Sequence, residues 1–294
     1  MKPFSYFSPR TLGEAIDLLI KHAPEAKILA GGTDLLVEMK EGIVTPQYVI
    51  DLKNIPALNH IELENQYLRI GALATVHEIE MHPSVREYTG ILAQAASLLG
   101  SLQIRNKGTI GGNLCHASPA ADLAPPLLAL EGKVGMIGKN GERMEDLENF
   151  FVGPGMTTLK SDEILTEIEV PLPPPGSTGI YLKFSPRKAM DLALVGVAAL
   201  ITLNTTSQIC TRARFALGAV APIPVRAKKS EKILEGQRIE RELLQEVSDQ
   251  AAEESRPISD IRGSAWYRKE IVKILVEQGI AQTFDQINRK PKEN

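Results

Sequence analysis

The N-terminal part of the chain combines one helical pattern of apolar positions with several short β-favouring runs. A segment opened by Thr11 carries apolar residues three and four positions apart, which predicts a helix. Compact apolar runs at 26–30, 48–52 and 67–72 are bounded by turn residues, and residues 60–63 alternate like a half-buried strand. These runs predict sheet elements rather than a helical bundle.

Two Gly-Gly pairs interrupt the pattern in comparable places. The pair 31–32 follows an apolar run and precedes Thr33 and Asp34, either of which could cap a short helix. Residues 84–104 have a mostly helical pattern, after which 105–113 reads as a loop that contains the second pair. A further helix-compatible stretch runs through Leu130.

A proline-rich stretch at 171–179 breaks every regular pattern, and it predicts a boundary between an N-terminal and a C-terminal α+β region. The C-terminal region begins with β-favouring runs and turns helical. Strands are expected near 181–184, 195–203 and 213–219, and helices at 231–234, 240–254 and 266–277.

Composition narrows the function classes. The 294 residues are 43% apolar, enough for two or three domains, and 33 basic against 36 acidic residues give a net charge of -3. No long like-charge run marks a nucleic-acid or anionic-membrane surface. The short basic cluster Arg226, Lys228 and Lys229 is expected to be the solvated start of a helix.

Two cysteines, Cys115 and Cys210, are too few for a disulfide framework, a structural zinc site or an iron–sulfur site. A reduced, cytoplasmic protein is therefore expected. The first residues lack the features of a signal peptide, and the longest apolar run, 192–203, is too short for a membrane span.

Common catalytic signatures are absent from the sequence. It contains no Gly-x-Ser-x-Gly elbow, no Walker loop, and no Gly-x-Gly-x-x-Gly after a first strand, which argues against a nicotinamide-binding Rossmann domain. His77 and His82 are five positions apart, so they face different sides of a helix and do not form a zinc-protease pair. No metal site is expected.

The two Gly-Gly pairs remain as candidate chemistry. Glycine lets the backbone approach a ligand closely, so that successive N–H groups can converge on a phosphate, and a helix starting near Leu35 would add its dipole. Either pair alone is as well explained as an ordinary turn. The flanking residues make a longer pattern.

That longer pattern closely resembles the flavin-binding chains of the molybdenum hydroxylases, such as the medium subunits of aerobic carbon monoxide dehydrogenase and the flavin domain of xanthine dehydrogenase. The resemblance extends over nearly the whole chain. It is carried by the residues at 27–35, 104–114, 117–122 and 162–165, by the opening 4–6 with Pro9 and 11–12, and by the ending 260–268.

By this resemblance the chain binds FAD non-covalently, with one segment around the pyrophosphate and a second wall holding phosphate, ribityl and ribose oxygens. Neutral donors suit phosphate oxygens, and a carboxylate accepts hydrogen bonds from sugar hydroxyls. The first segment is Ile28, Leu29, Ala30, Gly31, Gly32, Thr33, Asp34 and Leu35, and the second wall is Thr109, Gly112, Asn113, Ser118 and Asp122. Because Asp34 would repel a pyrophosphate, it is preferred as a helix cap over a direct ligand.

The resemblance also implies apolar positions near the flavin ring or the adenine, namely Gly100, Ile104, Ile164 and Leu165. Ile164 and Leu165 could equally be simple core residues. Lys183 matches a lysine close to the flavin edge, although it could equally be an ordinary surface lysine. Residues 184–194 match a loop that governs nicotinamide access in xanthine dehydrogenase, and the same use is not assumed here.

The chain lacks motifs for two [2Fe-2S] centres and for a molybdopterin domain, so a large molybdopterin subunit and a small [2Fe-2S] subunit are expected as partners. It also lacks the cysteine-rich insert found in one branch of the family. Cys115 and His116 are not expected to be a ligand pair.

The resemblance implies an α+β fold of the vanillyl-alcohol-oxidase (PCMH) type. The expected parts are two FAD-binding subdomains at 1–56 and 57–175, a C-terminal domain at 176–284 and a polar tail at 285–294. The implied function is electron transfer from partner iron–sulfur centres through FAD to NAD, a quinone, a carrier protein or oxygen, in a dimer of heterotrimers. A free-standing flavin oxidase and a scaffold that has lost its flavin are the two alternatives.

Overall fold

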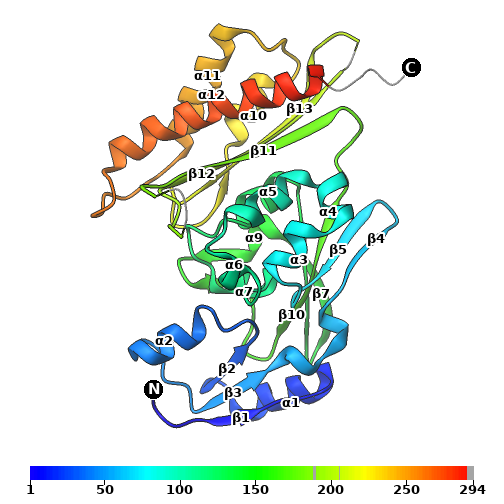
Figure 1. Ribbon diagram of the computed structural model, residues 1–294, viewed down its shortest axis with the longest axis vertical. Coiled ribbons are helices and arrows are strands. Elements are labelled where there is room, and N and C mark those ends of the chain that lie inside the picture. Colours follow the sequence, from blue (N-terminus) through cyan, green and yellow to red (C-terminus); the bar gives the residue numbers. More distant parts are fainter. Residues whose placement is uncertain (188–189, 205, 290–294) are drawn as a thin grey trace.

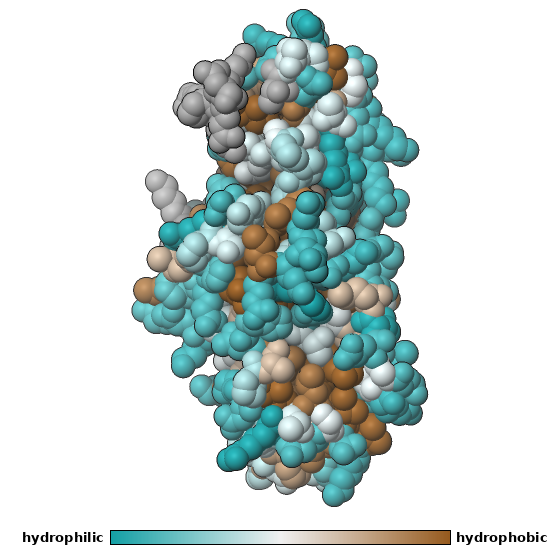
Figure 2. Space-filling view, turned by 90° about the vertical axis from the view of Figure 1, so that its right-hand side faces the viewer, coloured by the Kyte–Doolittle hydropathy of each residue, from teal (hydrophilic) through white to brown (hydrophobic). Residues whose placement is uncertain are grey.

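The computed structural model describes residues 1–187, 190–204 and 206–289. They form three tiers along the long axis of the molecule, each built on its own sheet (Figure 1). Within the described ranges, no helix is long and apolar enough to cross a membrane. The face in Figure 2 is mostly hydrophilic, with an apolar area in its lower third, at the height of the first tier. The expected α+β architecture is confirmed.

The first tier contains the N-terminus and a parallel sheet in the order β1-β3-β2. Thr11 caps its first helix by accepting a hydrogen bond from the Glu14 amide, as the sequence pattern predicts. The elements are β1 (Ser5–Phe7), α1 (Leu12–His22), β2 (Ala26–Leu29), α2 (Leu35–Glu41) and β3 (Tyr48–Asp51), followed by two short 3-10 turns, Leu52–Asn54 and Pro56–Leu58.

The middle tier is a five-stranded antiparallel sheet, in the order β4-β5-β10-β6-β7, with short helices packed against it. Its strands are β4 (Ile61–Glu64), β5 (Tyr67–Gly71), β6 (Lys133–Gly138), β7 (Gly141–Asp146) and β10 (Ile164–Pro171), with a small hairpin of β8 (Phe151–Gly153) and β9 (Met156–Thr157). Its helices are α3 (Val76–Met81), α4 (Pro83–Tyr88), α5 (Gly90–Leu98), α6 (Leu102–Arg105), α7 (Ile110–His116), α8 (Ala124–Ala129) and α9 (Leu147–Phe150).

The third tier is a four-stranded sheet in the order β11-β12-β13-β14, covered on its outer face by three helices (Figure 1). Every residue of β12 is buried, since α5 and α8 cover the other face of this sheet. Its elements are β11 (Ser177–Phe184), β12 (Val195–Leu203), β13 (Cys210–Gly218), β14 (Val225–Arg226), α10 (Lys228–Leu234), α11 (Arg241–Glu254) and α12 (Ala265–Arg289).

Three local predictions differ from the structure. The second Gly-Gly pair lies in the first turn of α7 rather than in a loop, because Thr109 caps that helix. Residues 177–179 of the proline-rich stretch already belong to β11. Arg226 is not solvated: its side chain is 7% exposed and pairs with Glu231 at 2.6 Å.

Candidate functional site

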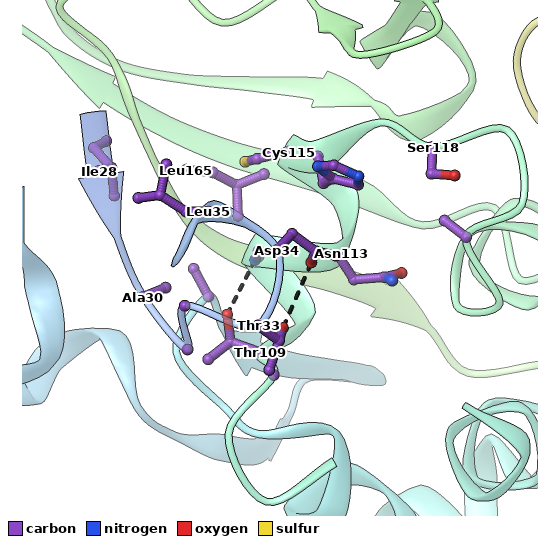
Figure 3. A pocket seen from close by; sticks show the side chains of 18 of the residues that line it. Ile28, Ala30, Thr33, Asp34, Leu35, Thr109, Asn113, Cys115, Ser118 and Leu165 are labelled. Atoms are coloured by element: carbon purple, nitrogen blue, oxygen red, sulfur yellow. Dashed lines mark hydrogen bonds between the residues drawn. The ribbon is translucent and has the colours of Figure 1, made fainter. Parts of the chain in front are cut away.

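One large cavity, of about 740 Å³, opens at the junction of the three tiers. Its walls come from the β2–α2 turn, from α6 and α7, from residues 118–122 and from the start of β10 (Figure 3). Residues 190–192 add a contribution from the third tier. This volume lies in the range typical of small-molecule and cofactor sites.

The first wall is the turn between β2 and α2, and its glycines are required by geometry. A Cβ on Gly31 would lie 1.9 Å from the carbonyl oxygen of Lys107, so this turn packs directly on the backbone before α7. Gly32 has a φ of +75°, which other residues rarely adopt. The first pair therefore serves both a close approach and a left-handed turn.

The second wall begins at the N-terminus of α7. The hydroxyl of Thr109 accepts a hydrogen bond from the Gly112 amide at 3.0 Å, and Gly111 packs so tightly on Ala72 that a Cβ would lie 2.7 Å from its carbonyl oxygen. A Cβ on Gly112 would meet only the Thr109 hydroxyl, at 2.9 Å. Beyond that atom, a side chain at position 112 would enter the cavity that Gly112 lines.

Asn113 supplies an unused polar atom on this wall. Its Oδ1 is buried and has no hydrogen-bond partner, although Asn113 lines the cavity. Buried polar atoms are nearly always paired, so this oxygen is free to accept a hydrogen bond from a donor on a ligand. A hydroxyl of a ribityl or ribose group is such a donor, so the acceptors of this wall, Asn113 Oδ1 and the Asp122 carboxylate, are chemically suited to the sugar part of FAD.

Asp34 occupies the position before α2, but it does not act as a cap. Its side chain accepts no hydrogen bond from the helix, and its backbone is already helical. The side chain is exposed and accepts a 3.5 Å hydrogen bond from the Thr33 hydroxyl (Figure 3). The prediction that Asp34 caps α2 is therefore wrong, because the carboxylate lies beside the cavity instead of over the helix end.

Asp122 and Lys183 form a buried ion pair at the side of the cavity nearest the third tier. Lys183 Nζ lies 2.7 Å from Asp122 Oδ2, and both side chains are less than a tenth exposed. Burial raises the pKa of Asp122, while Lys183 and the Tyr181 hydroxyl act in the opposite direction. Asp122 lines the cavity and Lys183 lies behind it.

The residues predicted for the site converge on this cavity, with two exceptions. Leu29 points into a small core cluster with Met39 and Val49, and Lys183 reaches the cavity only through Asp122. Those that line it are Ile28, Ala30, Gly31, Gly32, Thr33, Asp34, Leu35, Gly100, Ile104, Thr109, Gly112, Asn113, Ser118, Asp122, Ile164 and Leu165.

Several lining residues were not predicted. Glu163 is held by Arg143 at 2.8 Å, and this guanidinium lowers the pKa of the carboxyl to about 2 against the opposing effect of burial. Cys115 lines the cavity as well, inside the wall where the resemblance had placed it, and burial raises the pKa of its thiol to about 12, which disfavours the thiolate. Glu163 lies within residues 162–165, which carry part of the family resemblance, and this position could have identified it as a lining residue from the sequence.

The loop 184–194 reaches the cavity through Met190, Asp191 and Leu192, while residues 188 and 189 lie outside the described part of the chain. His116 faces Glu38 at 3.8 Å. Over the described residues, no group of three or more His, Cys, Asp or Glu side chains could hold a metal ion.

Two family models match most of the chain. Residues 2–173 match the family model of the FAD binding domain in molybdopterin dehydrogenase, and residues 180–283 match that of the CO dehydrogenase flavoprotein C-terminal domain. The chain is 34% identical to the nicotinate dehydrogenase FAD-subunit of Eubacterium barkeri, over 98% of both chains. It is 35% identical to the carbon monoxide dehydrogenase medium chain of Hydrogenophaga pseudoflava, over 94% of this chain and 96% of that one.

A solved structure of the carbon monoxide dehydrogenase from Hydrogenophaga pseudoflava superposes with a TM-score of 0.93 at 33% identity. The superposition covers 97% of this chain and 98% of the other. Fold and sequence therefore agree over nearly the full length.

Proposed function

Because the chain belongs to the family of FAD-binding medium subunits of molybdenum hydroxylases, we propose that it holds FAD in the central cavity and relays electrons within an oxidoreductase complex. The observation that carries the proposal is the contact between the two glycine segments. Gly31 packs on the backbone at Lys107, and the two glycine segments line a cavity that also presents the unpaired Asn113 oxygen.

The first glycine segment would hold the pyrophosphate. The backbone at 30–33 lines the cavity, and without side chains at 31 and 32 its N–H groups would be able to approach a phosphate. Thr109 keeps its hydroxyl on the Gly112 amide, so its role is to shape the second wall. Asn113 and Ser118 would then meet the ribityl and ribose hydroxyls.

The flat rings need apolar walls, which other lining residues provide. Ile164 and Leu165 are both buried, at 1% and 4% exposure, and both line the cavity at the start of β10. Gly100 and Ile104 line another part, where Gly100 has a φ of +51° and packs against the Ile104 side chain. Ile164 and Leu165 would therefore serve as core and as ligand wall at once, whereas Ile104 is 38% exposed and would serve as wall alone.

Bound FAD would accept electrons and pass them on, and the protein would position and tune it. We propose that the electrons come from [2Fe-2S] centres of a small partner subunit, after substrate oxidation on a large molybdopterin subunit. They would leave to NAD, a quinone, a carrier protein or oxygen. The proposed assembly is a dimer of heterotrimers.

We also propose the division into subdomains at 1–56 and 57–175 and a C-terminal domain at 176–284. Separate sheets in the three tiers support it, as do the two family matches at 2–173 and 180–283. The last helix, α12, continues through Arg289, and Ile287 packs against the third-tier core, so the proposed tail from 285 begins within a helix.

Anaerobic mixing of the FAD-loaded chain with its reduced iron–sulfur partner tests the electron relay. We expect the flavin absorption to bleach as the partner is reoxidised. The matched control mixes the partner with the same chain stripped of FAD, which should leave the partner reduced. A flavin that stays oxidised in the assembled complex would contradict the relay.

A further inference from the structure

A buried tyrosine shares the Asp122 carboxylate with Lys183. The Tyr181 hydroxyl donates a hydrogen bond to Asp122 Oδ1 at 2.8 Å, while Lys183 Nζ donates to Oδ2 at 2.7 Å. Tyr181 is 1% exposed and is among the largest fully buried side chains of the described chain. Each carboxylate oxygen therefore has its own donor.

Both donors come from one face of β11. Residues two apart in a strand point to the same side, so Tyr181 and Lys183 project together from the third tier toward Asp122 in the middle tier. Helix α5 fixes this strand: Gln94 Oε1 accepts from the Tyr181 amide at 2.9 Å, and the Leu98 carbonyl accepts from Lys183 at 3.2 Å. The three side chains thus join two tiers beside the cavity.

The fold also leaves room for this hydroxyl. A Cβ on Gly196, in the neighbouring strand β12, would lie 2.7 Å from the Tyr181 hydroxyl oxygen. Any side chain at position 196 would push the ring off its present place. The hydroxyl is therefore confined by Gly196 on one side and directed at Asp122 on the other.

The position of the Tyr181 hydroxyl matters because of the charge on Asp122. Asp122 lines the cavity, whereas neither Tyr181 nor Lys183 does, so the carboxylate is the charged group of this cluster that faces the ligand. A flavin ring becomes more negative when it is reduced, and a carboxylate nearby opposes that reduction unless its charge is neutralised. Lys183 supplies the neutralising charge, and a hydrogen bond from Tyr181 disperses what remains.

We propose that Tyr181 is a positioning residue of the flavin site, which fixes Asp122 against Lys183 and thereby keeps the flavin easier to reduce. This inference rests on the proposed function, since it requires FAD in the cavity with its ring beside Gly100, two residues from the Leu98 carbonyl that Lys183 binds. Tyr181 does not touch the cavity itself. Its effect on the flavin passes through Asp122.

The test is the midpoint potential of bound FAD in the complete chain, measured by anaerobic dye-coupled reduction. Tyr181→Phe removes the hydroxyl and keeps the ring. We expect the equilibrium constant for two-electron reduction of the bound FAD to fall about tenfold, which corresponds to a midpoint potential lower by about 30 mV. Gly196→Ala displaces the hydroxyl without deleting it, and we expect a shift in the same direction.

Thr283→Val is the matched control, because it removes a buried hydroxyl that bonds to Gly279 in α12, away from the cavity. Its potential should equal that of the wild type. FAD affinity and thermal unfolding of the apo chain are recorded for every variant. Tyr181→Phe should change the FAD dissociation constant by less than about threefold, which separates tuning from loss of binding.

A double-mutant cycle tests the route through Asp122. In an Asp122→Asn background, Tyr181→Phe should no longer shift the potential, since the charge that it disperses is gone. An unchanged or raised potential in Tyr181→Phe overturns the inference, and so does a shift that persists in Asp122→Asn. If wild-type chain binds no FAD at all, the proposed function itself fails and the inference falls with it.

Discussion

Gly31 lies directly on the carbonyl oxygen of Lys107, at a distance that leaves no room for a Cβ. Next to it, a Cβ on Gly108 would lie 3.4 Å from the Thr33 hydroxyl. The β2–α2 turn and the approach to α7 are thus in contact although they are far apart in sequence. Each glycine segment limits where the other can lie, and the shape of the cavity that both segments line depends on this contact.

Gly31→Ala should separate the two segments. The atoms in the way are backbone atoms, which cannot rotate aside as the end of a side chain can, so we expect a loss of about 1–3 kcal/mol in the free energy of unfolding. Denaturant unfolding of the apo chain measures it. Gly13→Ala is the control: a Cβ there meets nothing within 4 Å in α1, and we expect a gain of up to about 1 kcal/mol. Equal stability of Gly31→Ala and wild type would show that the contact is not tight.

Thr75 and Asp34 precede helices of similar length, but their replacement by alanine should lower the free energy of unfolding by different amounts. Thr75 forms a capping box with Glu78, whose amide donates to the Thr75 hydroxyl at 3.1 Å and whose carboxylate accepts from the Thr75 amide at 2.7 Å. Thr75→Ala should cost about 1 kcal/mol in the free energy of unfolding, whereas Asp34→Ala should cost less than about 0.5 kcal/mol. Thermal and denaturant unfolding of both variants measures these losses. A larger loss of stability in Asp34→Ala than in Thr75→Ala would show that Asp34, and not Thr75, caps its helix.

Glu163 should make the free energy of unfolding fall as the pH is lowered in the acidic range. Its pKa is lowered to about 2 in the folded chain, first by the Arg143 hydrogen bond, and an unfolded glutamate has a pKa of about 4.3. A lowered folded pKa means that the stabilisation is present above about pH 4.3 and is lost as the pH falls toward about 2. Glu163→Gln should therefore cost about 2 kcal/mol at neutral pH, and progressively less in acid.

Urea unfolding of wild type and Glu163→Gln at about pH 7 and about pH 3 measures this difference. Glu145, which also contacts Arg143 but is 20% exposed, provides the comparison through Glu145→Gln. The effect of that substitution should be smaller at neutral pH. A difference between wild type and Glu163→Gln that stays constant with pH would contradict the account.

Arg268 should be essential to the packing of α12. It is 1% exposed, pairs with Asp260 at 2.8 Å and donates to the carbonyls of Leu194 and Ala219. Arg268→Met removes the guanidinium donor from the Leu194 and Ala219 carbonyls, while Asp260 keeps Arg262, and it should lower the free energy of unfolding by about 3 kcal/mol. Arg262 contacts the same carboxylate but is 36% exposed, so Arg262→Met should cost less than about 1 kcal/mol. Similar losses in the two variants would contradict this distinction.

Strong periodic patterns were sufficient to predict much of the fold. The nine-residue strand β12 has the predicted limits although its apolar run has no period, since enrichment in β-branched residues favours a strand over a buried helix. The second glycine pair was misjudged because Gly-Gly is locally a turn signal. It lies in α7 because Thr109 caps the helix and Gly111 packs on Ala72, and the second of these contacts depends on the tertiary fold.

Charged residues were harder to place than apolar ones. Arg226 reads as part of a solvated basic cluster, and its burial depends on Glu231 and on the sheet around it. Lys183 was expected either close to the flavin edge or as an ordinary surface lysine, and its ammonium is instead buried against Asp122, which comes from another tier. Such pairings join distant segments, so no local pattern contains them.

The most direct measurement of the central claim is a titration of the chain, alone and with its partners, with FAD, FMN and NAD, followed by flavin fluorescence. Gly112→Val fills the cavity from α7, and Gly13→Val places the same substitution on an exposed helix position. We predict that wild type and Gly13→Val bind FAD, and that Gly112→Val binds it about tenfold or more weakly. If FAD fails to bind even in the assembled complex, or binds Gly112→Val as tightly as wild type, the cavity is not the flavin site.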